Sequence, residues 1–294
     1  MQISLLSKPG DVTLSEKDFR RVSNLIYDYC GINLHVGKKE LVRARLAKRV
    51  RRGGFGSFTQ YIEYALNDPA HEEFSSLVDC LTTNTTSFFR EEKHFAFLKD
   101  VVLPHMIEAK RGEKKNKIRA WSAACSSGEE PYSLAITVLD KLDNPGAWDV
   151  KILATDISTR MLERCRVGLY PKERVQPVPP QQRQRYLQAV RIDGETHYEV
   201  GPGLRSVVMF RYLNLMEAWP FRGPFDFIFC RNVMIYFDKP TQEKLINRLW
   251  EVLAPGGFLF VGHSESLTGI KHPFRYVQPT IYEKMQNSTP RRQS

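Results

Sequence analysis

The chain has 294 residues, 42% of them hydrophobic and 26% charged, which are ordinary globular values and exclude a chain that is disordered throughout. Its net charge of +10 favours acidic partners, whether nucleic acid, an anionic membrane or an acidic protein surface, without choosing among them. The five cysteines are widely spaced and form no CxxC pair, which argues against a disulfide framework or a zinc site, so no metal is expected. No stretch reads as a signal peptide or membrane span, and we expect a soluble, cytoplasmic protein.

Residues 13–79 predict four short helices and no strand. The first runs through SEKDFRRVSNLIYDYCG, with Ser15 or Thr13 as its cap and Gly31 at its end. The others cover KKELVRARLAKRVRR, SFTQYIEYALN and HEEFSSLVDCLTTN. We therefore predict a helical domain over residues 1–80, followed by a linker with a helix over residues 81–117.

From Ile118 onward, strands alternate with helices, which predicts a mainly parallel, Rossmann-like α/β domain over residues 118–286. Pro131 is expected at the first position of the helix after the first strand. The rhythm breaks at residues 171–210, where we expect an inserted small β sub-domain. Within it, residues 196–210 predict a hairpin that turns at Gly201-Pro202-Gly203. The polar residues 287–294 are predicted to be a disordered tail.

The loop after the first strand is where an open α/β sheet binds its ligand. Here it reads ACSSGEEP over residues 124–131, which matches neither the dinucleotide nor the P-loop fingerprint. Glu129 and Glu130 would repel a pyrophosphate at the helix start. A cofactor with positive groups and no phosphate, such as S-adenosylmethionine, suits this loop, although the two acids could instead stabilise the helix dipole.

Asp156 ends the second strand, the usual position of a ribose-hydroxyl acceptor in nucleoside-binding folds. A helix-capping role for Asp156 or Ser158 is the alternative. GHSES, at residues 262–266, is similar to the nucleophile elbow G-x-S-x-G but lacks its last glycine, which disfavours a hydrolase.

Several motifs in order resemble one family, the chemotaxis receptor methyltransferases of the CheR type. They are TTNTTSFFRE (residues 82–91), WSAACSSGEEPYS (121–133), ATDIS (154–158), FDFIFCRNVMIYFD (225–238) and GHSES (262–266). LAPGGF, at residues 253–258, is also similar to the segment of class I methyltransferases where a helix is followed by a Pro-Gly-Gly turn and an apolar strand. The resemblance implies a helical domain, a class I methyltransferase domain and an inserted antiparallel β sub-domain.

The same resemblance implies transfer of the methyl group of S-adenosylmethionine to glutamate carboxylates on receptor helices, with S-adenosylhomocysteine as product. Glu130 would meet the methionine amino group, Asp156 the ribose and Asn214 the adenine. The implied cofactor site comprises Asn84, Thr86, Arg90, Glu130, Asp156, Leu213, Asn214, Arg231 and Asn232. In some relatives the β sub-domain also binds a receptor C-terminal peptide, and the sequence leaves that function open here.

A glutamate carboxylate, with a reference pKa of ~4.3, is already a nucleophile at neutral pH, so no general base is required. We expect Arg90 to position substrate or cofactor and the hydroxyl of Tyr236 to shape the transfer pocket. The alternatives are a surface charge at Arg90 and an aromatic wall at Tyr236. Arg231-Asn232-Val233-Met234 replaces the Asn/Asp-Pro-Pro-aromatic motif that many amine and amide methyltransferases carry, which disfavours a nitrogen acceptor.

Residues 38–52 hold eight basic residues and one acid, Glu40. Arg45, Lys48, Arg49 and Arg52 recur at helical spacing and are predicted to dock acidic receptor helices, although a solvated helix face is the plainer alternative. No aromatic-interleaved basic run or nucleic-acid module accompanies them, so we expect no nucleic-acid partner. A nucleic-acid methyltransferase and a cofactor-binding regulator without turnover are the rival functions, and a monomer is expected.

Overall fold

The computed structural model describes residues 13–69, 72–112 and 116–285. The chain divides into two compact units, Met1–Thr83 and Asn84–Ser294. The tail predicted at residues 287–294 lies outside the described residues. No helix of the described residues is both long enough and apolar enough to cross a bilayer.

The first unit is helical, as predicted. Its elements are α1 (Glu16–Cys30), a 3-10 turn (Val36–Lys38), α2 (Lys39–Arg52), α3 (Phe58–Asn67) and α4 (Glu72–Leu81). Ser15 rather than Thr13 caps α1, because its hydroxyl accepts the backbone N–H of Asp18, and Gly31 ends the helix in a left-handed conformation. Apolar side chains at helical spacing, including Val22, Ile26 and Leu46, are fully buried and hold the helices together.

The second unit is an α/β domain built on one large sheet. Its helices are α5 (Glu92–Phe97), α6 (Leu103–Gly112), α7 (Glu129–Lys141), α8 (Thr159–Val167), α9 (Pro180–Tyr186), α10 (Pro202–Arg205) and α11 (Lys239–Val252), with shorter helical turns at Leu98–Val102, Pro145–Ala147 and Met234–Tyr236. Its strands are β1 (Lys117–Ala123), β2 (Asp149–Asp156), β3 (Leu169–Pro171), β4 (Leu187–Ile192), β5 (Glu195–Val200), β6 (Val208–Tyr212), β7 (Phe225–Cys230), β8 (Leu253–Val261), β9 (Arg275–Gln278) and β10 (Ile281–Glu283).

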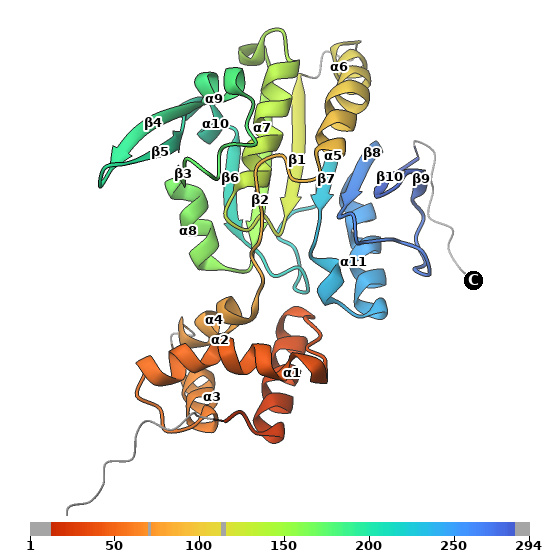
Figure 1. Cartoon of the computed structure of the whole chain (residues 1–294). Helices are drawn as coiled ribbons and strands as arrows, with labels where there is room; N and C mark the ends of the chain where they lie inside the picture. The colour runs from red at the N-terminus through yellow and green to blue at the C-terminus, as the bar shows by residue number, and fades with distance from the viewer. Residues whose placement is uncertain (1–12, 70–71, 113–115, 286–294) are drawn as a thin grey trace, which may run out of the picture. The chain divides into compact units, whose positions relative to one another are not determined.

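The large sheet has the order β6-β2-β1-β7-β8-β10-β9 (Figure 1). Its five strands from β6 to β8 are parallel, and β10 and β9 add an antiparallel edge. This confirms the predicted Rossmann-like sheet. Because parallel strands end at the same edge, the loops after β1, β2, β6, β7 and β8 are brought together there.

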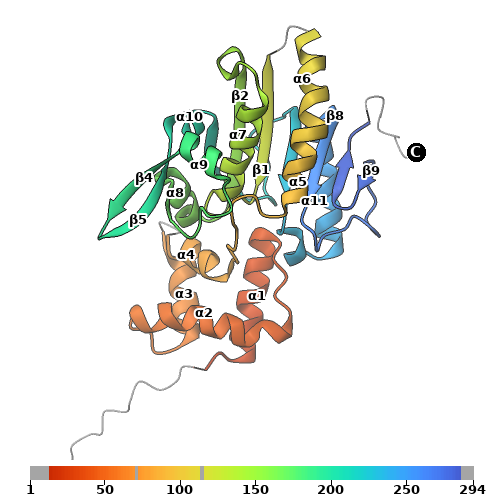
Figure 2. The same cartoon turned by 45° about the horizontal axis from the view of Figure 1, so that its top comes forward.

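A second sheet, with the order β3-β5-β4, is antiparallel and confirms the predicted small β insertion. It lies on the opposite side of β1 from β9 in both views (Figures 1 and 2). The hairpin predicted over residues 196–210 is wrong. The hairpin of this sub-domain instead joins β4 to β5 and turns at Asp193-Gly194, where both residues have positive φ. Pro202 starts α10, and β6 pairs with β2 in the large sheet.

Two local predictions also need correction. The helix after β1 starts at Glu129, so Pro131 is its third residue; proline is tolerated there because a first-turn N–H has no partner within the helix. The Pro255-Gly256-Gly257 run falls inside the bounds of β8, where the register with β7 shifts and Gly256 has a φ of 76°. The run therefore marks an irregular strand start rather than a separate turn.

Candidate functional site

The candidate site lies at the carboxyl edge of the parallel strands. β1 leads into residues 124–128, and β2 ends at Asp156. β6 leads into Leu213 and Asn214, and β7 into Arg231 and Asn232. The sheet thus brings together most of the residues predicted to bind the cofactor, and the segment of residues 84–91 hydrogen-bonds to Arg231 and Asn232.

The loop after β1 has an unusual backbone. Ala124 and Ser126 have φ values of 62° and 50°, and Gly128 has 97°. Non-glycine residues in the left-handed region cost free energy, so neighbouring bonds must hold them there. The N–H of Cys125 donates to Thr155 O at 2.9 Å, and that of Ser126 to the Asp156 carboxylate at 2.7 Å. The loop is therefore fixed to the end of β2.

Asp156 accepts backbone N–H groups on both carboxylate oxygens. Oδ2 accepts from Ser126, and Oδ1 accepts from Ser158 at 2.9 Å. Ser158, not Asp156, caps α8 through its hydroxyl. Each carboxylate oxygen can accept more than one hydrogen bond, which is the chemistry that binding of ribose hydroxyls requires. A ribose-binding role for Asp156 stays a prediction.

Glu130 forms a buried ion pair with Arg231. Glu130 Oε2 lies 3.1 Å from Arg231 Nε, and the two side chains are 11% and 1% exposed. Glu130 Oε1 accepts the Ser122 hydroxyl at 2.7 Å. Burial raises the pKa of Glu130, and Arg231 opposes that shift. The acid at the start of α7 therefore faces into the site, rather than only meeting the helix dipole in solvent.

Arg231 is also bonded to the segment before α5. Its Nη2 donates to Arg90 O at 2.7 Å, and its Nε lies 3.8 Å from Glu91 Oε2. Glu91 Oε1 in turn accepts from Asn232 Nδ2 at 3.1 Å and from the N–H of His263 at 3.2 Å. Burial alone would raise the pKa of Glu91, but Arg231 and these donors outweigh it and lower that pKa. Arg231 thus joins two buried carboxylates from different segments.

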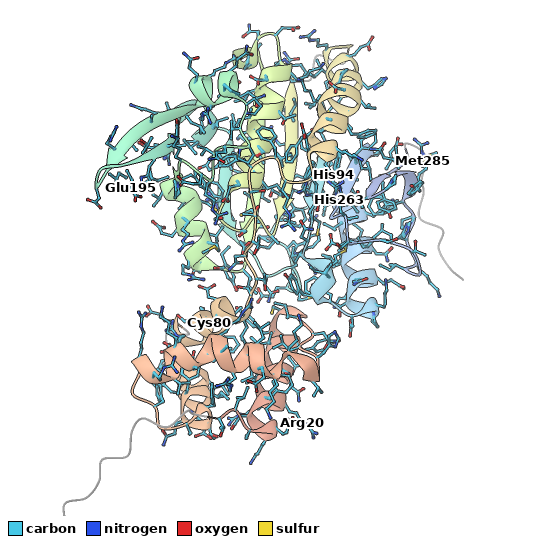
Figure 3. All side chains as sticks on the ribbon, viewed as in Figure 1. Arg20, Cys80, His94, Glu195, His263 and Met285 are labelled. Atoms are coloured by element: carbon cyan, nitrogen blue, oxygen red, sulfur yellow. The ribbon has the colours of Figure 1, made fainter. Side chains whose placement is uncertain are left out.

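His94 is buried beside this pair and is held neutral. Burial and the Arg231 charge lower its pKa to about 4. The Thr280 hydroxyl donates to Pro279 O, so it accepts from His94 Nε2 at 2.6 Å. His94 Nδ1 is then the acceptor for Arg231 Nη1 at 3.2 Å. Figure 3 labels His94 and His263, whose rings lie 5.2 Å apart.

Glu91, His94 and His263 offer ligand atoms within 4.8 Å of one another, the kind of set that can hold a metal ion. However, both ring nitrogens of His94 already have hydrogen-bond partners, Arg231 at Nδ1 and Thr280 at Nε2. The trio is therefore accounted for as part of the Arg231 network, and the absence of a metal stays a prediction.

Glu265 is a residue of this edge that sequence reasoning missed. It is 6% exposed and accepts four backbone N–H groups, from Gly262, Asn232, Met234 and Ile235 at 2.5, 2.8, 2.7 and 3.3 Å. Burial raises its pKa, and the four N–H groups oppose the shift. Its signal was an acid within GHSES directly after a buried strand. Glu265 fixes the loop that carries Asn232 and Tyr236.

The other predicted site residues have local partners. Asn84 O accepts the Ser126 hydroxyl at 2.8 Å, and Arg90 Nη1 donates to Thr85 O at 2.7 Å. Asn214 is buried; its Oδ1 accepts the N–H of Met216, and its Nδ2 donates to Glu217. Leu213 is buried, and Thr86 and Tyr236 are half-buried. Their roles in cofactor binding and methyl transfer stay predictions.

The basic stripe of α2 has two kinds of member. Arg45 donates to Leu81 O, Thr82 O and Thr83 Oγ1, and Arg49 forms a bidentate pair with Glu73 at 2.7 Å on both arms. These two arginines serve contacts within the helical unit. Lys48 and Arg52 are exposed. Of the four residues of the predicted docking stripe, Lys48 and Arg52 are therefore the two with exposed side chains.

Comparisons with known proteins agree with this architecture. Residues 17–82 match the family model for the CheR methyltransferase all-alpha domain, and residues 84–282 match that for its SAM binding domain. A probable chemotaxis protein methyltransferase of Rhizobium etli is 41% identical over 88% of this chain and 96% of its own length. The chemotaxis protein methyltransferase of Escherichia coli is 40% identical over 95% of this chain and 94% of its own. The chain belongs to the CheR methyltransferase family.

Proposed function

We propose that the protein methylates glutamate side chains of chemotaxis receptors, with S-adenosylmethionine as methyl donor, and that it acts as a monomer in the cytoplasm. The observation that carries the proposal is the set of buried acids at the carboxyl edge of the sheet. Glu130 at the start of α7 and Asp156 at the end of β2 offer carboxylates to a positive amino group and to ribose hydroxyls. That set of acceptors suits a phosphate-free nucleoside cofactor better than a dinucleotide.

Each predicted cofactor residue then has a task consistent with its position. Asn214 follows β6 and is proposed to lie near the adenine, with Leu213 beside it. Asn84, Thr86 and Arg90 come from the segment that hydrogen-bonds the loop after β1. Arg231 is proposed to support the cofactor site without lining it, because its side chain is 1% exposed and holds Glu130 and Arg90 O in place.

When bound, S-adenosylmethionine supplies a methyl group already activated by its sulfonium. The protein must therefore strip water from the receptor carboxylate, align it and hold it close, an effect that can contribute roughly 7 to 11 kcal/mol. Arg90 is proposed to orient the carboxylate or the cofactor. Tyr236, in the turn that Glu265 anchors, is proposed to present its hydroxyl to the transfer pocket.

We propose that the receptor docks through Lys48 and Arg52 of α2. Arg45 and Arg49 belong to the same proposed face, although their side chains also hydrogen-bond within the helical unit. Exposed cations steer acidic helices and lose this effect as salt rises. The double reversal Lys48→Glu/Arg52→Glu should weaken receptor binding strongly. Lys17→Glu/Arg20→Glu, an equal change of charge at two exposed positions of α1, should weaken it much less. Equal losses in both variants would refute a specific face.

The proposed reaction is tested by methyl transfer from radiolabelled S-adenosylmethionine to receptor-containing membranes, followed by mild base. We expect label that base releases as methanol, because esters hydrolyse and methylamines do not. Base-stable label, or label in added nucleic acid, would refute carboxyl methylation. Tight cofactor binding with no label on any receptor set would favour a regulator without turnover.

A further inference from the structure

Two side chains of the inserted sub-domain contact segments around the proposed cofactor site. The hydroxyl of Tyr170, in β3, donates to Ser127 O at 2.7 Å. Arg174, just after β3, donates from Nη1 to Thr86 O at 2.8 Å, and the same nitrogen lies 3.2 Å from Glu129 Oε1. The insertion therefore reaches both segments from which the proposed cofactor site is built.

Glu129 makes the Arg174 contact consequential. Its side chain is only 1% exposed, and its other oxygen accepts the Ser127 hydroxyl at 2.7 Å. A buried carboxylate that loses its cation loses the interaction that offsets its desolvation. The side chain of Glu129 would then shift, which would disturb the first turn of α7, where the next residue is Glu130, and the strained loop before it.

We propose that Arg174 is a positioning residue for S-adenosylmethionine. By joining Thr86 O to Glu129, Arg174 sets the spacing between the segment of residues 84–91 and the start of α7. The inserted sub-domain thereby controls how well the site is preorganised for the cofactor, although Arg174 itself does not touch the reacting atoms. This inference rests on the cofactor site of the proposed function.

Three substitutions separate charge from hydrogen bonding. Arg174→Ala removes both contacts and should raise the Kd for S-adenosylmethionine about tenfold, equivalent to about 1.4 kcal/mol. Arg174→Lys should stay close to the wild-type Kd, because both contacts come from one nitrogen and an ammonium can replace it. Arg174→Gln keeps a donor without the charge and should fall between the two.

Arg185→Ala is the matched control. Arg185 belongs to the same insertion and also pairs with an acid of α7, but its partner is Asp140, near the far end of that helix, at 3.2 Å. Its Kd for the cofactor should stay at the wild-type value. In the Arg174 variants, kcat at saturating cofactor should change much less than the KM for the cofactor.

Calorimetric titration of the full chain with S-adenosylmethionine decides the outcome. A wild-type protein that binds no cofactor would refute the proposed function itself. Wild-type binding with an unchanged Kd in Arg174→Ala would refute only this inference, as would an equal loss in Arg185→Ala. If Arg174→Ala does not fold, equal Kd values for the Lys and Gln variants would refute the role of the charge.

Discussion

Glu265→Gln should destabilise the α/β unit and loosen its cofactor site. The carboxylate spreads four backbone N–H bonds over two oxygens: Oε2 accepts from Gly262 and Asn232, and Oε1 accepts from Met234 and Ile235. A glutamine offers one acceptor oxygen and one amide nitrogen. Whichever way the amide is turned, its NH2 group faces two N–H donors.

The size of the effect follows from these bonds. Two N–H groups lose their acceptor, one in a buried bond and one in a part-buried bond, at roughly 1.5 kcal/mol each, so the free energy of unfolding should fall by about 3 kcal/mol. The cost of burying the carboxylate charge, seen in the raised pKa of Glu265, keeps the expected loss at the low end for charged acceptors. The displaced loop also carries Asn232 and Tyr236, so turnover should fall as well.

Urea unfolding followed by tryptophan fluorescence reports on the unfolding of the α/β unit, which contains Glu265. All four tryptophans, Trp121, Trp148, Trp219 and Trp250, lie beyond residue 84, so the helical unit contributes no signal. Glu195→Gln, at an exposed end of β5, is the control and should unfold like the wild type. A loss below about 1 kcal/mol for Glu265→Gln would refute the argument that the four bonds act together.

Three further outcomes are expected. His94 has a pKa of about 4 in the folded chain against 6.5 as its ordinary value, so the unfolded chain binds the extra proton and stability should fall by about 3 kcal/mol as pH drops from 6.5 to 4. His94→Gln should flatten urea-unfolding stability over that window, and an unchanged slope would contradict the buried neutral imidazole. Tyr236→Phe should lower kcat roughly tenfold, the effect of one lost hydrogen bond, with the cofactor Kd unchanged; wild-type turnover would remove the hydroxyl from the mechanism. Gly194→Ala should lower the free energy of unfolding by about 1 kcal/mol, because Gly194 has a φ of +83°, although the space around it is open. Gly203→Ala, in open space without positive φ, should lower it less, and equal melting temperatures for the two variants would refute turn strain.

The architecture was predictable because local patterns carry it. Helical spacing of apolar residues predicted the first unit, and alternation of strands with helices predicted the parallel sheet. The predicted hairpin was wrong because it was centred on the two glycines flanking Pro202, whereas Asp193-Gly194 is the stronger hairpin signal, and because the pairing of β6 with β2 joins residues far apart in sequence.

The site was predictable only as a set of positions. The carboxyl-edge rule indicated Asp156 and the loop after β1. The partners depended on distant segments: Glu91 and Arg231 meet across 140 residues of chain, since they are numbered 91 and 231. Arg49 pairs with Glu73 across 24 residues, so its charge already has a partner within the helical unit. Spacing along one helix cannot reveal such tertiary partners.

The most direct test of the central claim is tandem mass spectrometry of receptor peptides after incubation with the protein and S-adenosylmethionine. We expect the mass of one added methylene on glutamate side chains, present with the wild-type protein and lost after mild base. Methylation confined to lysine, arginine or other nitrogen-bearing residues, or a modification that survives base, would contradict glutamate ester formation.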